Sequence, residues 1–158
     1  MPKIYMAWRR LDGISGHEMG RLLLAELYDR HVGGRMPAIA IAPKGKPYFV
    51  ESPWHFSVSH SKRHAFCLLS DVPVGVDAEE LDRKIDLRMA QKLLSAGELA
   101  QFEAAADQKK ALLSFWVLKE ATAKHNGEGI RIHPNHTNFS LPDSRVQEID
   151  GCLVAVVY

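Results

Sequence analysis

The chain has 158 residues, of which 46% are hydrophobic, so it is long enough to bury a core as one compact domain or two small halves. Its 20 Lys and Arg residues nearly balance its 19 Asp and Glu residues, and the formal net charge is +1. This balance gives no overall electrostatic reason to expect nucleic acid or a membrane as a partner. No stretch approaches the roughly 18 apolar residues of a membrane span, so we expect a cytoplasmic protein.

The two cysteines, Cys67 and Cys152, both lie in apolar runs. Two cysteines provide neither a disulfide framework nor a metal cage. A free thiol in such a run behaves as a small hydrophobic group, so we interpret both cysteines as core residues.

The first part of the chain predicts a strand, a helix and then several short strands. Residues 4–8 alternate as on a half-buried strand, and Ser15 is followed three residues later by Glu18, the spacing of a helix capping box. We expect a helix to follow and to end at Gly33-Gly34. Four short runs then predict an antiparallel meander of strands at residues 38–42, 48–50, 54–59 and 65–70.

A break at Asp71-Val72-Pro73 separates this part from a second one that also begins with a strand, at residues 74–79. Asp86 is a suitable N-cap for a helical run at 87–94, and Ser95 with Glu98 forms another capping box. A long helix at 108–125 should end at Asn126-Gly127-Glu128-Gly129, before strands at 146–149 and 152–157 that flank a tight turn at Asp150-Gly151. This order predicts an α+β fold with two halves, residues 1–73 and 74–158.

Asp77 and Glu79 are two residues apart on the strand at 74–79, so both side chains project to one face. Two adjacent carboxylates repel each other, and a hard cation such as Mg²⁺ would relieve that repulsion. The alternative is an ordinary solvated acidic pair. Glu80 points to the opposite face, and we interpret it as a residue without a role in the chemistry.

Trp116, Glu120 and Lys124 are spaced four apart on the long helix and share one side of it. The alternative here is a surface ion pair between the carboxylate and the ammonium. Lys119 lies about 100° round the helix from Glu120, where it is either a solvated charge or a phosphate ligand. Residues 56–64 end a strand in hydroxyls, imidazoles and cations, a composition suited to holding phosphate.

In their order along the chain, these segments resemble five motifs of the surfactin-synthetase-type 4′-phosphopantetheinyl transferases. The motifs are Gly45-Lys46-Pro47, Phe56-Ser57-Val58-Ser59-His60-Ser61, Val74-Gly75-Val76-Asp77-Ala78-Glu79, Leu94-Ser95-x-x-Glu98, and Trp116-Val117-Leu118-Lys119-Glu120-Ala121-x-x-Lys124 followed by Gly127-Glu128-Gly129. The resemblance implies two similar α+β halves related by a pseudo-twofold axis, with coenzyme A bound in the cleft between them.

The resemblance also implies roles for individual residues. Asp77, Glu79 and Glu120 match the family's magnesium ligands, and Glu120 matches the proposed general base, a role that a water on the metal could take instead. Lys124 matches the lysine that stabilises the leaving phosphate. The residues assigned to coenzyme A are Arg21, Lys46, Pro47, Ser59, His60, Lys119 and Lys124.

The implied activity is transfer of the 4′-phosphopantetheine arm of coenzyme A to a serine of an apo acyl or peptidyl carrier protein. Adenosine 3′,5′-bisphosphate is released, Mg²⁺ or Mn²⁺ is required, and the enzyme is expected to be monomeric. One alternative is a non-catalytic homologue that binds coenzyme A or a carrier protein, and another is an unrelated Mg²⁺-dependent phosphohydrolase. The chain departs from the family at Leu94 and Ala78 and in its short start, where Arg9 and Arg10 could replace basic residues that longer relatives carry.

Overall fold

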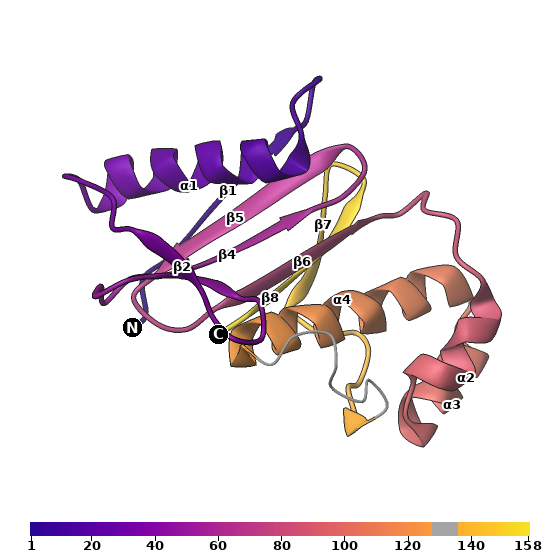
Figure 1. The fold of residues 1–158 in the computed structure, drawn as a ribbon. Helices are drawn as coiled ribbons and strands as arrows, with labels where there is room; N and C mark the ends of the chain where they lie inside the picture. Colours follow the sequence, from indigo (N-terminus) through magenta and orange to yellow (C-terminus); the bar gives the residue numbers. More distant parts are fainter. Residues whose placement is uncertain (128–135) are drawn as a thin grey trace.

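The computed structural model describes residues 1–127 and 136–158, which form a mixed α+β fold. Strands lie in a central layer, with α1 on one side and α4, α2 and α3 on the other (Figure 1). The elements in chain order are β1 (Ile4–Arg10), α1 (Gly16–His31), β2 (Ile39–Ile41), β3 (Pro47–Phe49), β4 (His55–His60), β5 (His64–Ser70), β6 (Gly75–Glu80), the 3₁₀ turn η1 (Leu87–Met89), α2 (Ala90–Leu93), α3 (Ala96–Ala104), α4 (Gln108–Asn126), β7 (Val146–Ile149) and β8 (Cys152–Val157). None of the helices in the described part of the chain is long and apolar enough to cross a membrane.

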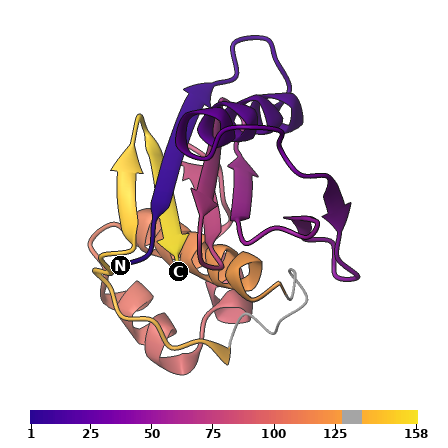
Figure 2. The ribbon, with the colours of Figure 1, turned by 90° about the vertical axis from the view of Figure 1, so that its left-hand side faces the viewer.

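The first sheet has the strand order β1-β5-β4 with antiparallel neighbours, and α1 covers it (Figure 2). The predicted N-cap is confirmed, because the Glu18 backbone N–H donates to Ser15 Oγ at 3.1 Å. The helix buries Leu23, Leu24 and Leu27 against this sheet. It ends at His31, just before Gly33-Gly34 as predicted.

The predicted meander is wrong, although each of its four strands is present. β2 pairs with β3 as a separate ribbon, while β4 pairs with β5 in the first sheet. The chain turns between the two hairpins at Val50–Glu51, where Glu51 has a φ of 51°. Pro53 follows this turn and has no N–H to continue a ladder.

The second sheet has the order β6-β8-β7, and α4 packs on β6 and β8. Gly75 allows this close packing, because a Cβ there would lie 2.0 Å from the Ala121 carbonyl oxygen of α4. The predicted hairpin turn is confirmed by positive φ angles at Asp150 (49°) and Gly151 (80°). The other predicted helices are also present, and the Ser95–Glu98 capping box is complete.

β4 and β6 bring the two sheets together through serine hydroxyls. The backbone N–H groups of Val76 and Ala78 donate to Ser57 Oγ at 3.0 Å and Ser59 Oγ at 3.1 Å. These bonds fix β6 beside β4, with α4 against it. Gly127 ends α4 in a left-handed conformation as predicted, whereas Glu128 and Gly129 of the same motif lie outside the described residues.

Candidate active site

Four charged side chains predicted from the sequence meet where α4 packs on β6. Asp77 and Glu79 come from β6, and Glu120 and Lys124 come from α4. The Lys124 ammonium donates to the Val76 carbonyl at 2.9 Å and to the Val58 carbonyl at 3.3 Å, and it lies 3.2 Å from Asp77 Oδ1. Lys124 therefore links both sheets to the carboxylate group.

Asp77 is the buried member of this group, with 8% of its surface exposed. Its Oδ1 accepts from Ser59 Oγ at 3.2 Å and from Lys124, whereas its Oδ2 is buried without a hydrogen-bond partner among the described residues. Burial raises the pKa of this carboxyl, although Lys124 and Ser59 oppose the rise. An ionised, unpartnered oxygen in this place favours binding of a cation.

The ionised forms of Glu79 and Glu120 are also disfavoured. Burial, followed by repulsion from Asp77, raises the pKa of Glu120 to about 7. The pKa of Glu79 is raised by burial, against the attraction of Arg83, whose guanidinium lies 2.5 Å from the Glu79 carboxylate. Hard carboxylate oxygens that repel one another are the donors that Mg²⁺ prefers, so this set fits that ion.

A pocket of about 260 Å³ opens beside Glu120 and Lys124. Lys46 lies in it with its ammonium 3.1 Å from the Val74 carbonyl, and burial together with repulsion from Lys124 lowers the pKa of Lys46. Two ammonium groups at one pocket provide a local site for an anion. The lining residues are Lys44, Gly45, Lys46, Pro47, Phe56, Ser57, Val58, Glu120, Ala123, Lys124 and Gly127.

Three other predicted coenzyme A ligands, Arg21, Ser59 and His60, are not among the residues that line this pocket. The Arg21 guanidinium lies 5.9 Å above the ring of Phe56, a pocket residue. Ser59 is only 5% exposed and its hydroxyl binds Asp77 and β6, so it positions the carboxylate rather than facing the pocket. His60 lines a different hollow, and its ring lies so close to Gly16 that a Cβ there would be 2.3 Å from His60 Cγ.

Three residues outside the predicted set of metal, catalytic and coenzyme A ligands lie in or beside the site. Phe56 and Ser57 line the pocket, and their place at the start of the Phe56–Ser61 motif is the signal that could have identified them. Arg83 follows Glu79 by four residues, but nothing in the sequence indicates that the chain folds back to pair them. In this conformation the Arg83 guanidinium contacts one carboxylate oxygen of Glu79, Oε1.

Lys119 does not join the site. Its side chain is 5% exposed, and its ammonium lies 2.6 Å from Glu98 Oε1, on a carboxylate that is fully buried. It also donates to Thr137 Oγ1. The prediction of Lys119 as a phosphate ligand is therefore not supported, and neither is the alternative of a solvated charge.

Replacing Lys119 by methionine is expected to lower the free energy of unfolding by about 3 kcal/mol, because it leaves a buried carboxylate without its counter-ion. Urea denaturation measures this loss. The double variant Lys119→Met/Glu98→Gln should recover part of the stability, since no buried charge remains. A loss below about 1 kcal/mol in the single variant would show that the ion pair is not needed to hold Glu98 in place.

Glu80 also differs from its interpretation as a residue without a role. It points to the opposite face of β6, as predicted, but it is 3% exposed and its Oε1 accepts from Ser61 Oγ at 2.8 Å and from the Arg63 N–H at 3.0 Å. Burial acts to raise its pKa, but hydrogen bonds led by that of His64 outweigh it and lower the pKa to about 2. The Cys152 thiol donates to Glu80 Oε2 at 3.4 Å, so this cysteine is a core residue, as predicted, that also makes a polar contact.

Comparisons with known proteins agree with this arrangement. The sequence model of the 4′-phosphopantetheinyl transferase superfamily matches residues 73–153, which include both strand carboxylates and the whole of α4. The 4′-phosphopantetheinyl transferase psf-1 of Bacillus pumilus is 34% identical over 120 residues, which cover 70% of this chain and 51% of the relative. The 4′-phosphopantetheinyl transferase gsp of Aneurinibacillus migulanus is 34% identical over 107 residues, which cover 66% of this chain and 44% of the relative.

The matched segments thus span about half the length of these curated relatives or less. The family match itself covers more than half of this chain and contains the cluster of Asp77, Glu79, Glu120 and Lys124. The chain belongs to the 4′-phosphopantetheinyl transferase superfamily.

Proposed function

We propose that this chain transfers the 4′-phosphopantetheine arm of coenzyme A to a serine of an apo carrier protein, with adenosine 3′,5′-bisphosphate as the second product. The observation that carries the proposal is the position of three mutually repelling carboxylates and Lys124 at the edge of a pocket that also holds Lys46. A pyrophosphate with its metal ion would satisfy both parts of this site, since it brings negative charge to the ammonium groups and a cation to the carboxylates.

The proposed fold has two similar halves, residues 1–73 and 74–158, related by a pseudo-twofold axis. The two three-stranded sheets support this, because their strand orders, β1-β5-β4 and β6-β8-β7, correspond. In each sheet the central strand is the one that comes last in its half of the sequence. In each half the main helix follows the first strand and precedes the other two strands of its sheet. The pocket lies between these halves, because Lys46 and Phe56 come from the first and Glu120 and Lys124 from the second.

In this proposal, coenzyme A lies along the pocket. Lys46 and Pro47 bound the side nearest the adenine, and Arg21 lies within reach of the 3′-phosphate across Phe56. Lys124 would contact the phosphate that leaves with adenosine, because its ammonium already faces Asp77 at the pocket edge. His60, an exposed side chain whose ring lies against Gly16 at the start of α1, would contact a phosphate of coenzyme A.

Asp77, Glu79 and Glu120 would hold Mg²⁺, which neutralises charge on the pyrophosphate when bound. Arg83 contacts only Oε1 of Glu79, so the second carboxylate oxygen would be the one offered to the metal. Glu120, or a water held by the metal, is the proposed base for the serine hydroxyl. Burial and Asp77 raise the pKa of Glu120 to about 7 in the metal-free chain, and a bound cation would lower it. Positioning and charge neutralisation account for most of the rate in phosphoryl transfer, and these residues provide both.

Incubation of the chain with coenzyme A, Mg²⁺ and a panel of apo carrier proteins, followed by intact mass spectrometry, tests the proposal. A carrier that gains the mass of phosphopantetheine supports it and names the class of carrier. Binding of coenzyme A without transfer would instead support a non-catalytic homologue. All of the proposed site residues come from one chain, so we also propose that the protein is a monomer. Light scattering tests this by measuring the molar mass.

Replacing Lys46 by methionine is expected to raise the KM for coenzyme A by about tenfold, with kcat changed less than threefold. The lost ammonium binds the substrate before and during transfer alike, and a charge-assisted contact of this kind contributes about 1.5 kcal/mol. Methionine keeps the unbranched stem that fills the pocket wall.

Steady-state kinetics with varied coenzyme A measures this effect. Lys3→Met is the matched control, because Lys3 is exposed at the start of the chain and lies outside the pocket. An unchanged KM in Lys46→Met would place the coenzyme A site elsewhere.

A further inference from the structure

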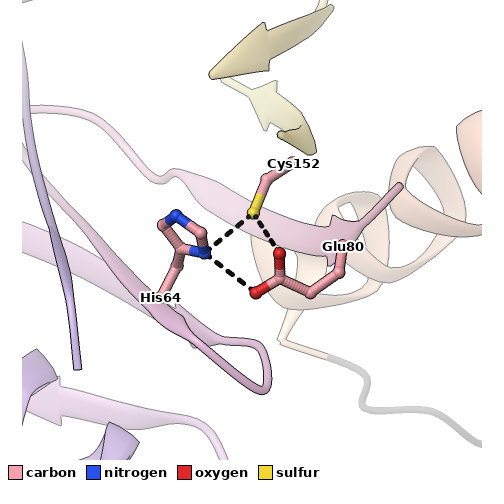
Figure 3. Close-up of side chains that lie close together, drawn as sticks. All are labelled: His64, Glu80 and Cys152. Carbon is pink, nitrogen blue, oxygen red and sulfur yellow. Dashed lines mark hydrogen bonds and ion pairs between the residues drawn. The ribbon is translucent and has the colours of Figure 1, made fainter. Parts of the chain in front are cut away.

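Three buried side chains meet on the face of β6 opposite Asp77 and Glu79. His64 of β5, Glu80 of β6 and Cys152 of β8 are 3%, 3% and 0% exposed, and they point toward one another (Figure 3). Cys152 Sγ lies 3.3 Å from His64 Nδ1 and 3.4 Å from Glu80 Oε2, while His64 Nδ1 lies 2.8 Å from Glu80 Oε1. The three residues come from three strands of two different sheets.

The spacing of these atoms is close to that of a tetrahedral zinc site. Bonds of about 2.3 Å to sulfur and about 2.0–2.2 Å to nitrogen and oxygen put neighbouring ligand atoms about 3.3–3.6 Å apart. Both distances from Cys152 Sγ fall within or beside this range. The contact between His64 Nδ1 and Glu80 would have to open by about half an ångström.

The surrounding hydrogen bonds hold the three groups in orientations that suit a metal. His64 Nε2 lies 2.8 Å from Asp150 Oδ2, and Arg10 holds that carboxylate through contacts of 2.7 and 2.8 Å. A carboxylate on the far nitrogen of a histidine fixes its ring. The near nitrogen now pairs with Glu80, and it would have to give up its proton to bind a metal. Ser61 Oγ donates to Glu80 Oε1 at 2.8 Å and fixes the second ligand in the same way.

The charges also match a divalent cation, since one thiolate and one carboxylate would balance it.

The row of Cys152, His64 and Asp150 resembles a nucleophile with its base, but the geometry does not support that role. The Cys152 side chain is fully buried, and burial together with Glu80 raises the pKa of its thiol to about 12. A substrate could neither reach this sulfur nor find it ionised, whereas a bound cation would itself displace the thiol proton.

We propose that His64, Glu80 and Cys152 bind a structural zinc ion that ties β5 to β6 and β8 and so fastens the two three-stranded sheets to each other. The mixed set of imidazole, carboxylate and thiolate is one that zinc accepts. These three side chains leave one tetrahedral position, which a water on the side of the hollow lined by Ser61, Arg63 and Glu80 would fill. The zinc would hold β6 from the side opposite its catalytic carboxylates. This proposal does not depend on the proposed transfer reaction.

Titration of the full chain with Co²⁺ in excess Mg²⁺ tests the site, because the Mg²⁺ occupies the carboxylates on the other face of β6. We expect one equivalent of Co²⁺ to produce a sulfur-to-cobalt charge-transfer band with tetrahedral d–d bands, and Zn²⁺ to displace both. Saturating Zn²⁺ should also raise the Tm by about 5 °C or more.

Two cysteine variants assign the band to this site. Cys152→Ser should abolish it, whereas Cys67→Ser should retain it, because Cys67 is an equally buried free thiol outside the cluster. Asp77→Asn should also retain the band. Glu80→Gln serves if Cys152→Ser does not fold, and it should weaken cobalt binding at least tenfold. Absence of the band in the unmodified chain, or its persistence in Cys152→Ser, would overturn the proposal and leave a hydrogen-bonded network.

Discussion

Replacing Asp77 by asparagine is expected to lower kcat/KM for transfer by roughly 10³-fold or more, which equals about 4 kcal/mol of transition-state stabilisation. Asparagine keeps the size of the side chain and an oxygen that can accept from Ser59. It removes the negative charge of the carboxylate whose Oδ2 is buried without a partner among the residues that the structure describes. A neutral amide binds Mg²⁺ more weakly, so the charge on pyrophosphate would be poorly neutralised.

The same substitution is expected to leave the Tm unchanged or to raise it. Burial raises the pKa of Asp77 above its unfolded value, so at neutral pH the ionised carboxylate favours the unfolded chain. An amide has no charge to desolvate, and this gain offsets the ion pair that Lys124 loses. Loss of activity without loss of stability is the pattern of a residue kept for function.

Asp82→Asn is the matched control, since it makes the same chemical change in a side chain that is 68% exposed, just after the end of β6. Its kinetics and Tm should match those of the unmodified chain. Steady-state kinetics at several Mg²⁺ concentrations and scanning calorimetry provide the measurements. Normal activity of Asp77→Asn at low Mg²⁺ would count against the metal assignment, and a large drop in Tm would indicate a structural role.

Features that depend on neighbours in the sequence could be predicted. Ser15 caps α1 through Glu18, three residues away, and Ser95 with Glu98 caps α3 in the same way. Asp150-Gly151 forms the predicted turn because its backbone conformation is a local property of the dipeptide. The spacing that puts Asp77 and Glu79 on one face is likewise local.

Features that depend on distant partners could not be predicted in this way. Lys119 binds Glu98, which is 21 residues away, so its helix position alone could not show that it is buried. Glu80 contacts Cys152 across 72 residues, and only the pairing of β6 with β8 brings them together. The meander failed for the same reason, because β3 does not pair with β4, and β4 lies instead beside β6, a strand that follows it later in the chain.

Replacing Glu120 by glutamine is expected to lower kcat by about 10³-fold, within the 10²–10⁴-fold that a positioned general base contributes. The amide can neither take the proton of the serine hydroxyl nor give Mg²⁺ a full negative charge. Single-turnover kinetics separates the chemical step from product release. Glu103→Gln is the matched control, since Glu103 is an exposed glutamate of α3. A kcat within tenfold of the unmodified chain would remove Glu120 from both roles.

The same variant is expected to change how stability depends on pH in the metal-free chain. The pKa of Glu120 is about 7 when folded and 4.5 when unperturbed, so between these values the folded chain binds more protons than the unfolded chain. Its stability therefore falls as pH rises through this window, and the loss is complete above the folded pKa. Glutamine does not titrate, so Glu120→Gln should lack this loss.

Relative to that of the unmodified chain, the free energy of unfolding of Glu120→Gln should therefore rise by about 2 kcal/mol when the pH is raised from about 5 to about 8. This figure is lower than the full pKa shift would give, because solvent partly screens the group. Urea denaturation in a chelator measures the difference at the two pH values. Added Mg²⁺ should stabilise the unmodified chain near pH 8 and remove most of the advantage of the variant, because the cation then neutralises the carboxylates. A difference between the two proteins that stays constant with pH would show that Glu120 is not held at a raised pKa by Asp77 and burial.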